Sequence, residues 1–186
     1  MTGMPLSQAF REAFRCHPAG VAVITADAGL GPVAMTVSSL ISVSAEPPMV
    51  AFSLSARSSS TSAVLAAETI VIHLLRYADL PLARLGAMSG ADRFGPDIAW
   101  ERLPNGAPRY TSVATWFLAR VAGTLIVPGA TVVTAELLDG TAATLAGAPE
   151  LESLIYLDRR WHRLRESADG TTSLTPLDAE NRDVFR

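Results

Sequence analysis

Short apolar runs rich in valine and isoleucine recur along this chain, and proline, glycine or charge interrupts them roughly every ten residues. Runs of this length favour strands, and none is long enough to span a bilayer as a helix. Many short strands with few helices predict a mainly β protein, an antiparallel β-barrel with peripheral helices, because barrel closure removes exposed strand edges. The expected strands cover residues 21–25, 33–36, 40–44, 49–54, 69–75, 113–127 and 131–138, a pair within 154–163, and a further candidate at 141–145.

Three segments show helical rather than strand periodicity. They cover 7–17, with Ser7 as the expected N-cap, then 58–67, and then 78–88, where Pro81 is tolerated only in the first turn. Residues 89–112 predict a long ordered loop, and loops of this length are often functional. The polar residues after Glu166 predict a tail or a dimer arm, and the whole chain, 1–186, is expected to form a single domain.

Composition excludes several classes of function. A formal net charge of −3 argues against nucleic acid or an anionic membrane as a partner. All basic residues are arginine, which excludes Schiff-base chemistry and a P-loop lysine. The single Cys16 excludes an internal disulfide and fits a reducing, cytoplasmic compartment. His17, His73 and His162 share no metal-ligand spacing, so no metal site is expected, and His73 is expected to be a hydrogen-bonded core residue.

Candidate binding residues gather at the two ends of the stretch 35–61. At the first end, the hydroxyls of Thr36, Ser38 and Ser39 suit the alternating donors and acceptors of a flavin ring, and a polar strand face in water explains them equally well. At the second end, the run Arg57-Ser58-Ser59-Ser60-Thr61 precedes an apolar helix, whose unpaired amides can hold a phosphate. Ordinary N-capping by Ser58 or Ser59 is the commoner arrangement.

Two further motifs have residue types that occur in ligand-binding sites. The run from Gly29 to Ala34 formally matches a dinucleotide fingerprint, but Pro32 and the β-branched run after it predict a hairpin turn and a strand rather than a helix. In the long loop, Arg93 with Phe94 and Trp100 nearby either contacts a ligand or belongs to a loop anchored by the aromatic residues.

Taken together, several short motifs resemble the flavin reductase-like family, the small split-barrel flavin proteins that serve two-component monooxygenases. The resemblance covers about residues 8–165 and depends on the order and spacing of its parts. These are Phe10-Arg11, Pro18-Ala19-Gly20-Val21, Met35-Thr36-Val37-Ser38-Ser39, Ser42-Val43-Ser44, Pro47-Pro48, Ser58-x-Ser60-Thr61, Ile72 to Leu75, Asp92-Arg93-Phe94, Trp100 and the hairpin after Val113.

The resemblance implies a split β-barrel homodimer that binds FMN or FAD at the subunit interface. It implies hydride transfer from NADH or NADPH to flavin N5, with reduced flavin passing to a partner oxygenase. Because the cofactors carry this chemistry, no side chain is assigned a catalytic role. Carried over by position, the flavin contacts are Thr36, Val37, Ser38 and Ser39 along the isoalloxazine, then Ser53, Leu54, Ser55, Ser58, Ser60 and Thr61 along the ribityl chain and phosphate, with Arg93 as a further contact.

The chain departs from the family pattern at three positions. Gly129-Ala130-Thr131 stands where many of these reductases have Gly-Asp-His, His73 stands where Asn is usual, and Leu80 stands where Gln often occurs. The first departure keeps a second hypothesis open, a flavin-binding protein that lacks NAD(P)H reductase activity. A third hypothesis is a structural barrel that binds no flavin.

Overall fold

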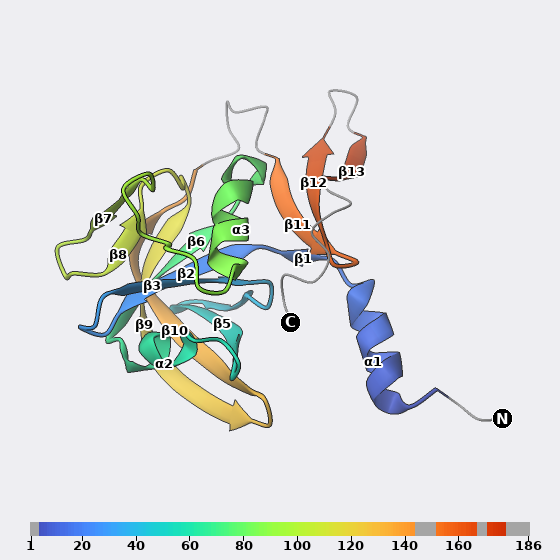
Figure 1. Ribbon diagram of the computed structural model, residues 1–186, viewed down its shortest axis with the longest axis horizontal. Helices are drawn as coiled ribbons and strands as arrows, with labels where there is room; N and C mark the ends of the chain where they lie inside the picture. Colours follow the sequence, from blue (N-terminus) through green and yellow to red (C-terminus); the bar gives the residue numbers. More distant parts are fainter. Residues whose placement is uncertain (1–3, 144–151, 167–170, 178–186) are drawn as a thin grey trace.

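A curled antiparallel sheet forms the body of the molecule (Figure 1). The computed structural model describes residues 4–143, 152–166 and 171–177. The order of the seven strands in this sheet is β3-β2-β6-β9-β10-β5-β4 within those residues. Their bounds are β2 (Ala22–Asp27), β3 (Pro32–Val37), β4 (Ile41–Ala45), β5 (Pro48–Ser55), β6 (Thr69–Leu74), β9 (Trp116–Val127) and β10 (Ala130–Thr141).

Smaller elements surround this sheet. A second sheet has the order β1-β11-β12-β13 in the described part of the chain, and β7 pairs with β8. The remaining strands are β1 (Ala19–Gly20), β7 (Trp100–Arg102), β8 (Pro108–Tyr110), β11 (Ser153–Leu157), β12 (Arg160–Glu166) and β13 (Thr172–Pro176). The helices are α1 (Leu6–Arg15), α2 (Thr61–Ala66), α3 (Leu80–Ala87) and the 3-10 turn η1 (Tyr77–Asp79).

The predicted mainly β class is confirmed, but the barrel does not close completely. Strands β3 and β4 end the sheet, and β4 pairs with β5 only as far as Ala51. Beyond that point the edge of β5 faces the edge of β3 without a backbone ladder. The Ser39 hydroxyl spans part of this opening, accepting from the Ser53 amide at 2.9 Å and donating to the Ser53 carbonyl at 3.2 Å. The result is a split barrel.

Strand β2 is buried along its whole apolar length because it has a core on each face. Its residues alternate between the two: Ile24 packs with Ile72 and Phe52 inside the curled sheet, whereas Val23 packs with Tyr110 on the outside. This alternation is the two-residue period of a strand. The outer core therefore fixes the segment 89–112 against the barrel.

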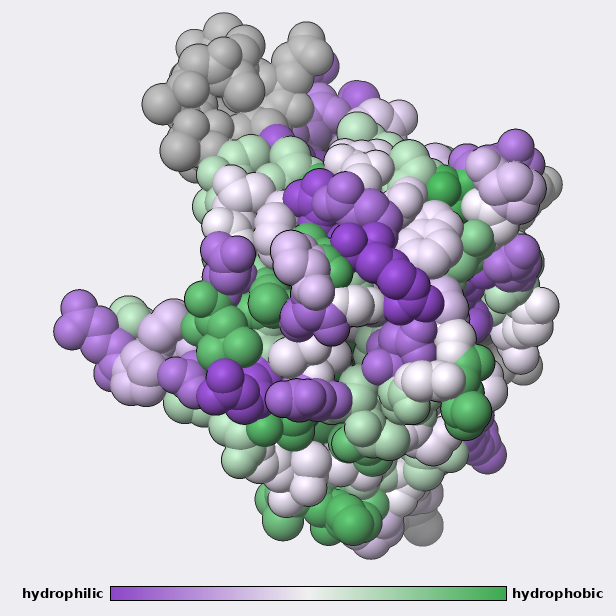
Figure 2. Space-filling model, turned by 90° about the vertical axis from the view of Figure 1, so that its left-hand side faces the viewer, coloured by the Kyte–Doolittle hydropathy of each residue, from purple (hydrophilic) through white to green (hydrophobic). Residues whose placement is uncertain are grey.

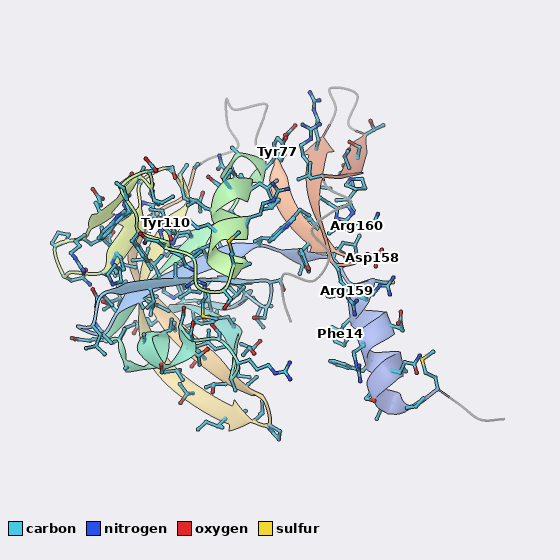
Figure 3. All side chains as sticks on the ribbon, viewed as in Figure 1. Phe14, Tyr77, Tyr110, Asp158, Arg159 and Arg160 are labelled. Carbon is cyan, nitrogen blue, oxygen red and sulfur yellow. The ribbon has the colours of Figure 1, made fainter. Side chains whose placement is uncertain are left out.

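Helix α1 projects away from the barrel and buries none of its residues (Figure 1). Its carboxyl end contacts the turn between β11 and β12, where Arg15 pairs with Asp158 and the Asp158 amide donates to the Arg15 carbonyl (Figure 3). Asp158 and Arg159 both have positive φ, as is typical of a tight two-residue turn between antiparallel strands.

Several expected boundaries were wrong. Helix α1 begins at Leu6 after Pro5, so Ser7 is inside the helix and is not its N-cap. Helix α2 starts three residues later than expected, at Thr61, and the long loop contains the β7–β8 pair. Part of the expected tail is strand β13, paired with β12. Strand β10 extends to Thr141, residues 142 and 143 of the candidate strand 141–145 are not in a strand, and residues 144 and 145 lie outside the described residues.

Other expectations were confirmed. The glycines after Asp27 form a hairpin turn between β2 and β3, in which the Asp27 carboxylate accepts from the amides of Gly29 and Gly31. Pro81 lies in the first turn of α3. Strand β4 also exists, although every one of its residues is exposed and neither face is buried. Among the described helices, none has the length and apolar character needed to cross a membrane.

His73 connects the barrel to the 89–112 segment. Its side chain is fully buried on β6, with Nδ1 3.2 Å from the Val23 carbonyl and Nε2 accepting from the Tyr110 amide at 3.0 Å. Donation from Nδ1 and acceptance at Nε2 together require the neutral imidazole. Burial lowers the pKa of His73 from 6.5 to about 4.

This depressed pKa predicts acid sensitivity of the fold. Between pH 6.5 and about 4 the unfolded chain binds a proton at His73 that the folded protein excludes. The contribution of neutral His73 to the free energy of unfolding is therefore fully present above pH 6.5. It is lost as pH falls through this window, by roughly 3 kcal/mol in total. Urea unfolding at pH 7 and pH 4.5 measures this loss. His73→Asn should lose less stability between the two pH values, and an equal loss in both proteins would contradict the assignment.

Candidate functional site

A continuous groove runs along the outer edge of β3, where the barrel is split. Its two sections have volumes of about 360 Å³ and about 240 Å³, and both are lined by Met35, Thr36 and Ser55. In an antiparallel ladder, alternate residues direct their backbone polar groups to the same side. Because β3 pairs with β2 on its other side, its outer N–H and C=O groups face this groove.

The inner section of the groove is lined by hydroxyl-bearing and apolar residues and has no charged side chain. It is lined by Val37 at the end of β3 and by Ser38 and Ser39 after it, by Ser53 and Ser55 of β5, and by Gly129 and Ala130 at the tip of the β9–β10 hairpin. The tip is held against β5, because the Gly129 carbonyl accepts from the Ala56 amide at 3.0 Å. Hydroxyls and backbone groups at this end can bind the donors and acceptors along the edge of a planar heterocycle.

The outer section carries two guanidinium groups. It is lined by Arg57, Ser58 and Ser59 on one side, and by Gly86, Ala87, Ser89 and Arg93 on the other. Arg93 donates from Nε to the Leu85 carbonyl and from Nη2 to the Met88 carbonyl, which fixes its position at the end of α3. These two hydrogen bonds use two of the five N–H donors of the Arg93 guanidinium. Neither arginine forms an ion pair with a carboxylate in the described residues, so this end can bind an anion such as a phosphate.

Thr36 and Gly86 set the distance between α3 and β3. The Thr36 hydroxyl donates to the Ala83 carbonyl at 2.7 Å. A Cβ atom on Gly86 would lie 2.4 Å from Thr36 Oγ1 and 3.2 Å from Thr36 N, so only glycine permits this approach. The width of the groove beside Thr36 therefore depends on Gly86 having no side chain.

Most of the residues expected from the sequence line this groove. Val37 is buried, so the backbone is the part of it that a ligand can reach. Eight of the expected residues are lining residues: Thr36, Val37, Ser38, Ser39, Ser53, Ser55, Ser58 and Arg93.

Three expected residues lie outside the lining. Leu54 is fully buried in the barrel core. The Ser60 hydroxyl donates to the Ala34 carbonyl at 3.2 Å, and the Thr61 hydroxyl donates to the Ser55 carbonyl at 2.7 Å. These two hydroxyls hold the 55–61 turn against β3 and β5, and neither caps α2. They position the residues that line the groove.

The groove also has lining residues that were absent from the expected set: Met35, Arg57, Ser59, Gly86, Ala87, Ser89, Gly129 and Ala130. Arg57 and Ser59 belong to the run identified from the sequence as a phosphate cradle. No periodicity in the sequence pointed to Gly86, which is one glycine within an ordinary amphipathic segment.

The chain is similar to flavin reductases in sequence and in fold. A family model described as "Flavin reductase like domain" matches residues 14–165. An NADH:FMN oxidoreductase of Rhodococcus erythropolis is 44% identical over 112 residues, 60% of this chain, and that match spans only 58% of the relative. The FMN reductase (NADH) RutF of Bradyrhizobium diazoefficiens is 30% identical over 157 residues, covering 83% of this chain and 84% of the relative. The crystal structure of a flavin reductase domain protein from Arthrobacter sp. FB24 superposes with a TM-score of 0.75 at 30% identity, covering 94% of this chain and 99% of that one.

The approach of Gly86 to Thr36 predicts the effect of one methyl group. Gly86→Ala should separate α3 from β3, weaken the Thr36–Ala83 hydrogen bond and lower the free energy of unfolding by about 1–3 kcal/mol. Urea unfolding measures this loss. Gly20→Ala is the matched control, because a Cβ there meets nothing within 4 Å. Unchanged stability of Gly86→Ala would show that the close approach does not constrain the helix.

Proposed function

Since the chain belongs to the flavin reductase-like family, we propose that it is an NADH- or NADPH-dependent flavin reductase that binds FMN or FAD in the groove beside β3. The observation that carries the proposal is the arrangement of one groove with an uncharged, hydroxyl-lined inner end and two arginines at its outer end. A flavin has this distribution: a planar ring with alternating donors and acceptors, a polyhydroxyl chain and a phosphate. The residues present fit the cofactor.

We assign each wall of the groove a part of the flavin. Ser38 and the outer backbone groups after Thr36 hold the edge of the ring, and Ser53 and Ser55 face the ribityl hydroxyls. Arg57, Ser58 and Arg93 hold the phosphate through charge-assisted hydrogen bonds. When bound, the flavin supplies the redox chemistry by accepting a hydride from the nicotinamide. This chain's residues orient the ring at the split, where Gly129 and Ala130 leave one side unobstructed by large side chains.

A second candidate function follows from the same hairpin. Ala130 and Thr131 give the inner end no charged or titratable group at the position where the family often has Asp-His. A flavin carrier, or an oxidoreductase with another electron donor, would have the same groove. Anaerobic mixing with FMN or FAD and then with NADH or NADPH separates the possibilities. Bleaching of the flavin band supports the reductase, flavin binding without bleaching supports the carrier, and no binding of either flavin contradicts both.

We further propose that residues 1–186 act as one domain in the cytoplasm, and that the reduced flavin serves a partner oxygenase. The chain is also proposed to form a homodimer through β4. Within the described part of the chain this strand ends the sheet with an unpaired edge, and it exposes Ile41 by 60% and Val43 by 56%. Exposed edges and apolar side chains of this kind are usually covered in native proteins. On the face shown in Figure 2, hydrophilic residues cross the middle and hydrophobic ones gather in separate patches.

The phosphate assignment predicts the effect of removing one guanidinium. Arg57→Ala should weaken flavin affinity roughly tenfold, because a charge-assisted contact to the phosphate is lost. Quenching of flavin fluorescence during titration measures the dissociation constant. Arg120→Ala is the control, because Arg120 is exposed on β9 away from the groove. Equal affinity of Arg57→Ala and the unchanged protein would exclude Arg57 from the phosphate site.

The dimer assignment predicts a change of mass in solution. Ile41→Asp should shift the protein from dimer to monomer while leaving its fold intact, because Ile41 is exposed in the single chain. Sedimentation velocity measures the mass, and circular dichroism checks the fold. Leu30→Asp is the control, since Leu30 is fully exposed at the β2–β3 turn. A dimer that persists in the Ile41→Asp protein would show that the interface is not formed by β4.

A further inference from the structure

A third cleft lies beyond the phosphate end of the groove. It has a volume of about 390 Å³, and its walls are the start of β3 at residues 32–34, the loop from Ala91 to Phe94, and Trp100. Arg93 lines both this cleft and the outer section of the groove. The three spaces therefore follow one strand in order, from residues 37–39 past Met35 and Thr36 to Pro32.

The chemistry of this outer cleft differs from that of the groove. Its apolar walls include Pro32 and the aromatic side chains of Phe94 and Trp100, and its polar walls are Asp92 and Arg93. An aromatic surface beside a carboxylate and a guanidinium suits a nucleoside next to a phosphate. The base stacks on the aromatic ring, the carboxylate accepts from ribose hydroxyls or an exocyclic amine, and the guanidinium binds the phosphate.

The aromatic wall is held in place by its own contacts. Trp100 Nε1 donates to the Phe94 carbonyl at 3.0 Å, and the Arg102 guanidinium lies 5.7 Å from the Trp100 ring centre. Phe94 stacks on Tyr110 with 5.4 Å between ring centres. The Tyr110 hydroxyl donates to the Arg93 carbonyl at 2.9 Å, and burial raises the pKa of Tyr110, so it remains a donor at neutral pH (Figure 3). The cleft is thus formed before any ligand arrives.

We propose that this outer cleft binds the adenosine end of FAD, so that the protein accepts the dinucleotide flavin and prefers it to FMN. The inference rests on the proposed flavin site and extends it. From Met35 and Thr36 to residues 32–34 the strand covers roughly 7–10 Å, which a second phosphate and a ribose must cross. Arg93 lies at the junction, where the pyrophosphate of FAD passes. An FMN bound in the same groove ends at Arg57 and Arg93 and leaves the aromatic wall without a ligand.

The test compares FAD with FMN on the native protein and on a variant that fills the cleft. Ala91→Leu places a larger side chain in the cleft and leaves Trp100, Phe94 and the residues of the inner groove unchanged. FAD should bind the native protein roughly tenfold more tightly than FMN, as expected for one stacked base. Ala91→Leu should remove this preference and leave FMN affinity unchanged. Ala99→Leu is the matched control, at an exposed position of the same loop that does not line the cleft.

A second variant addresses the stacking surface directly. Trp100→Leu should also lower the affinity for FAD to that for FMN. An equal loss of affinity for both flavins would show that the substitution damages the loop, and Ala91→Leu then tests the cleft independently. Equal affinity of the native protein for FAD and FMN, or an Ala91→Leu protein that keeps its preference, would overturn the proposal. If Ala91→Leu raises the KM for NADH and leaves FAD binding unchanged, the cleft holds the adenosine of NADH instead, and the assignment to FAD is wrong. Failure to bind either flavin would contradict the proposed function itself.

Discussion

The absence of a backbone ladder between β3 and β5 is the constraint on which the rest of the site depends. A sheet that curls on itself places its two outer edges face to face, and unpaired backbone groups there need partners. The Ser39 hydroxyl forms hydrogen bonds with both the amide and the carbonyl of Ser53, and the rest of the opening remains as a groove. The 55–61 turn, α3 and the hairpin tip then border the opening, so the position of the groove follows from where the ladder stops.

The strands could be predicted from the sequence because each has a local signal. Alternation of apolar residues, β-branched composition and turns at glycine or proline predicted the strands of the large sheet and the long β9–β10 hairpin. The polar residues at 36–39 and 57–58 were likewise visible as clusters. The first cluster precedes the β4–β5 pair and the second follows it, so the fold of this pair brings the two clusters into one groove. The strands and the two polar clusters could be predicted because their signals come from residues that are close together in the sequence.

The remaining features depend on partners that are distant in the chain. Ser60 and Thr61 look like phosphate ligands beside Ser58, yet their hydroxyls bond to carbonyls of β3 and β5. Gly86 matters because Thr36 lies opposite it, and the two are fifty residues apart. The exposure of β4 likewise follows from its place at the end of the sheet. No short window of sequence contains both Gly86 and Thr36, or both Ser60 and Ala34, so no local pattern could indicate these pairs. Thr61 and Ser55 are near each other in sequence, but their hydrogen bond depends on how the turn between them folds.

The stacked contacts of the 89–112 segment have an evolutionary consequence. His73 attaches the segment to the barrel at the Tyr110 amide. Within the segment, Tyr110 stacks on Phe94 and donates to the Arg93 carbonyl, and Trp100 donates to the Phe94 carbonyl, so its parts are held together at a few points. Between these points, Ala91 and its neighbours contribute side chains to the cleft without contributing to the barrel core. Substitutions there can alter the shape of the cleft while the fold is conserved. Related chains can therefore diverge in ligand preference through this one segment, without passing through unstable intermediates.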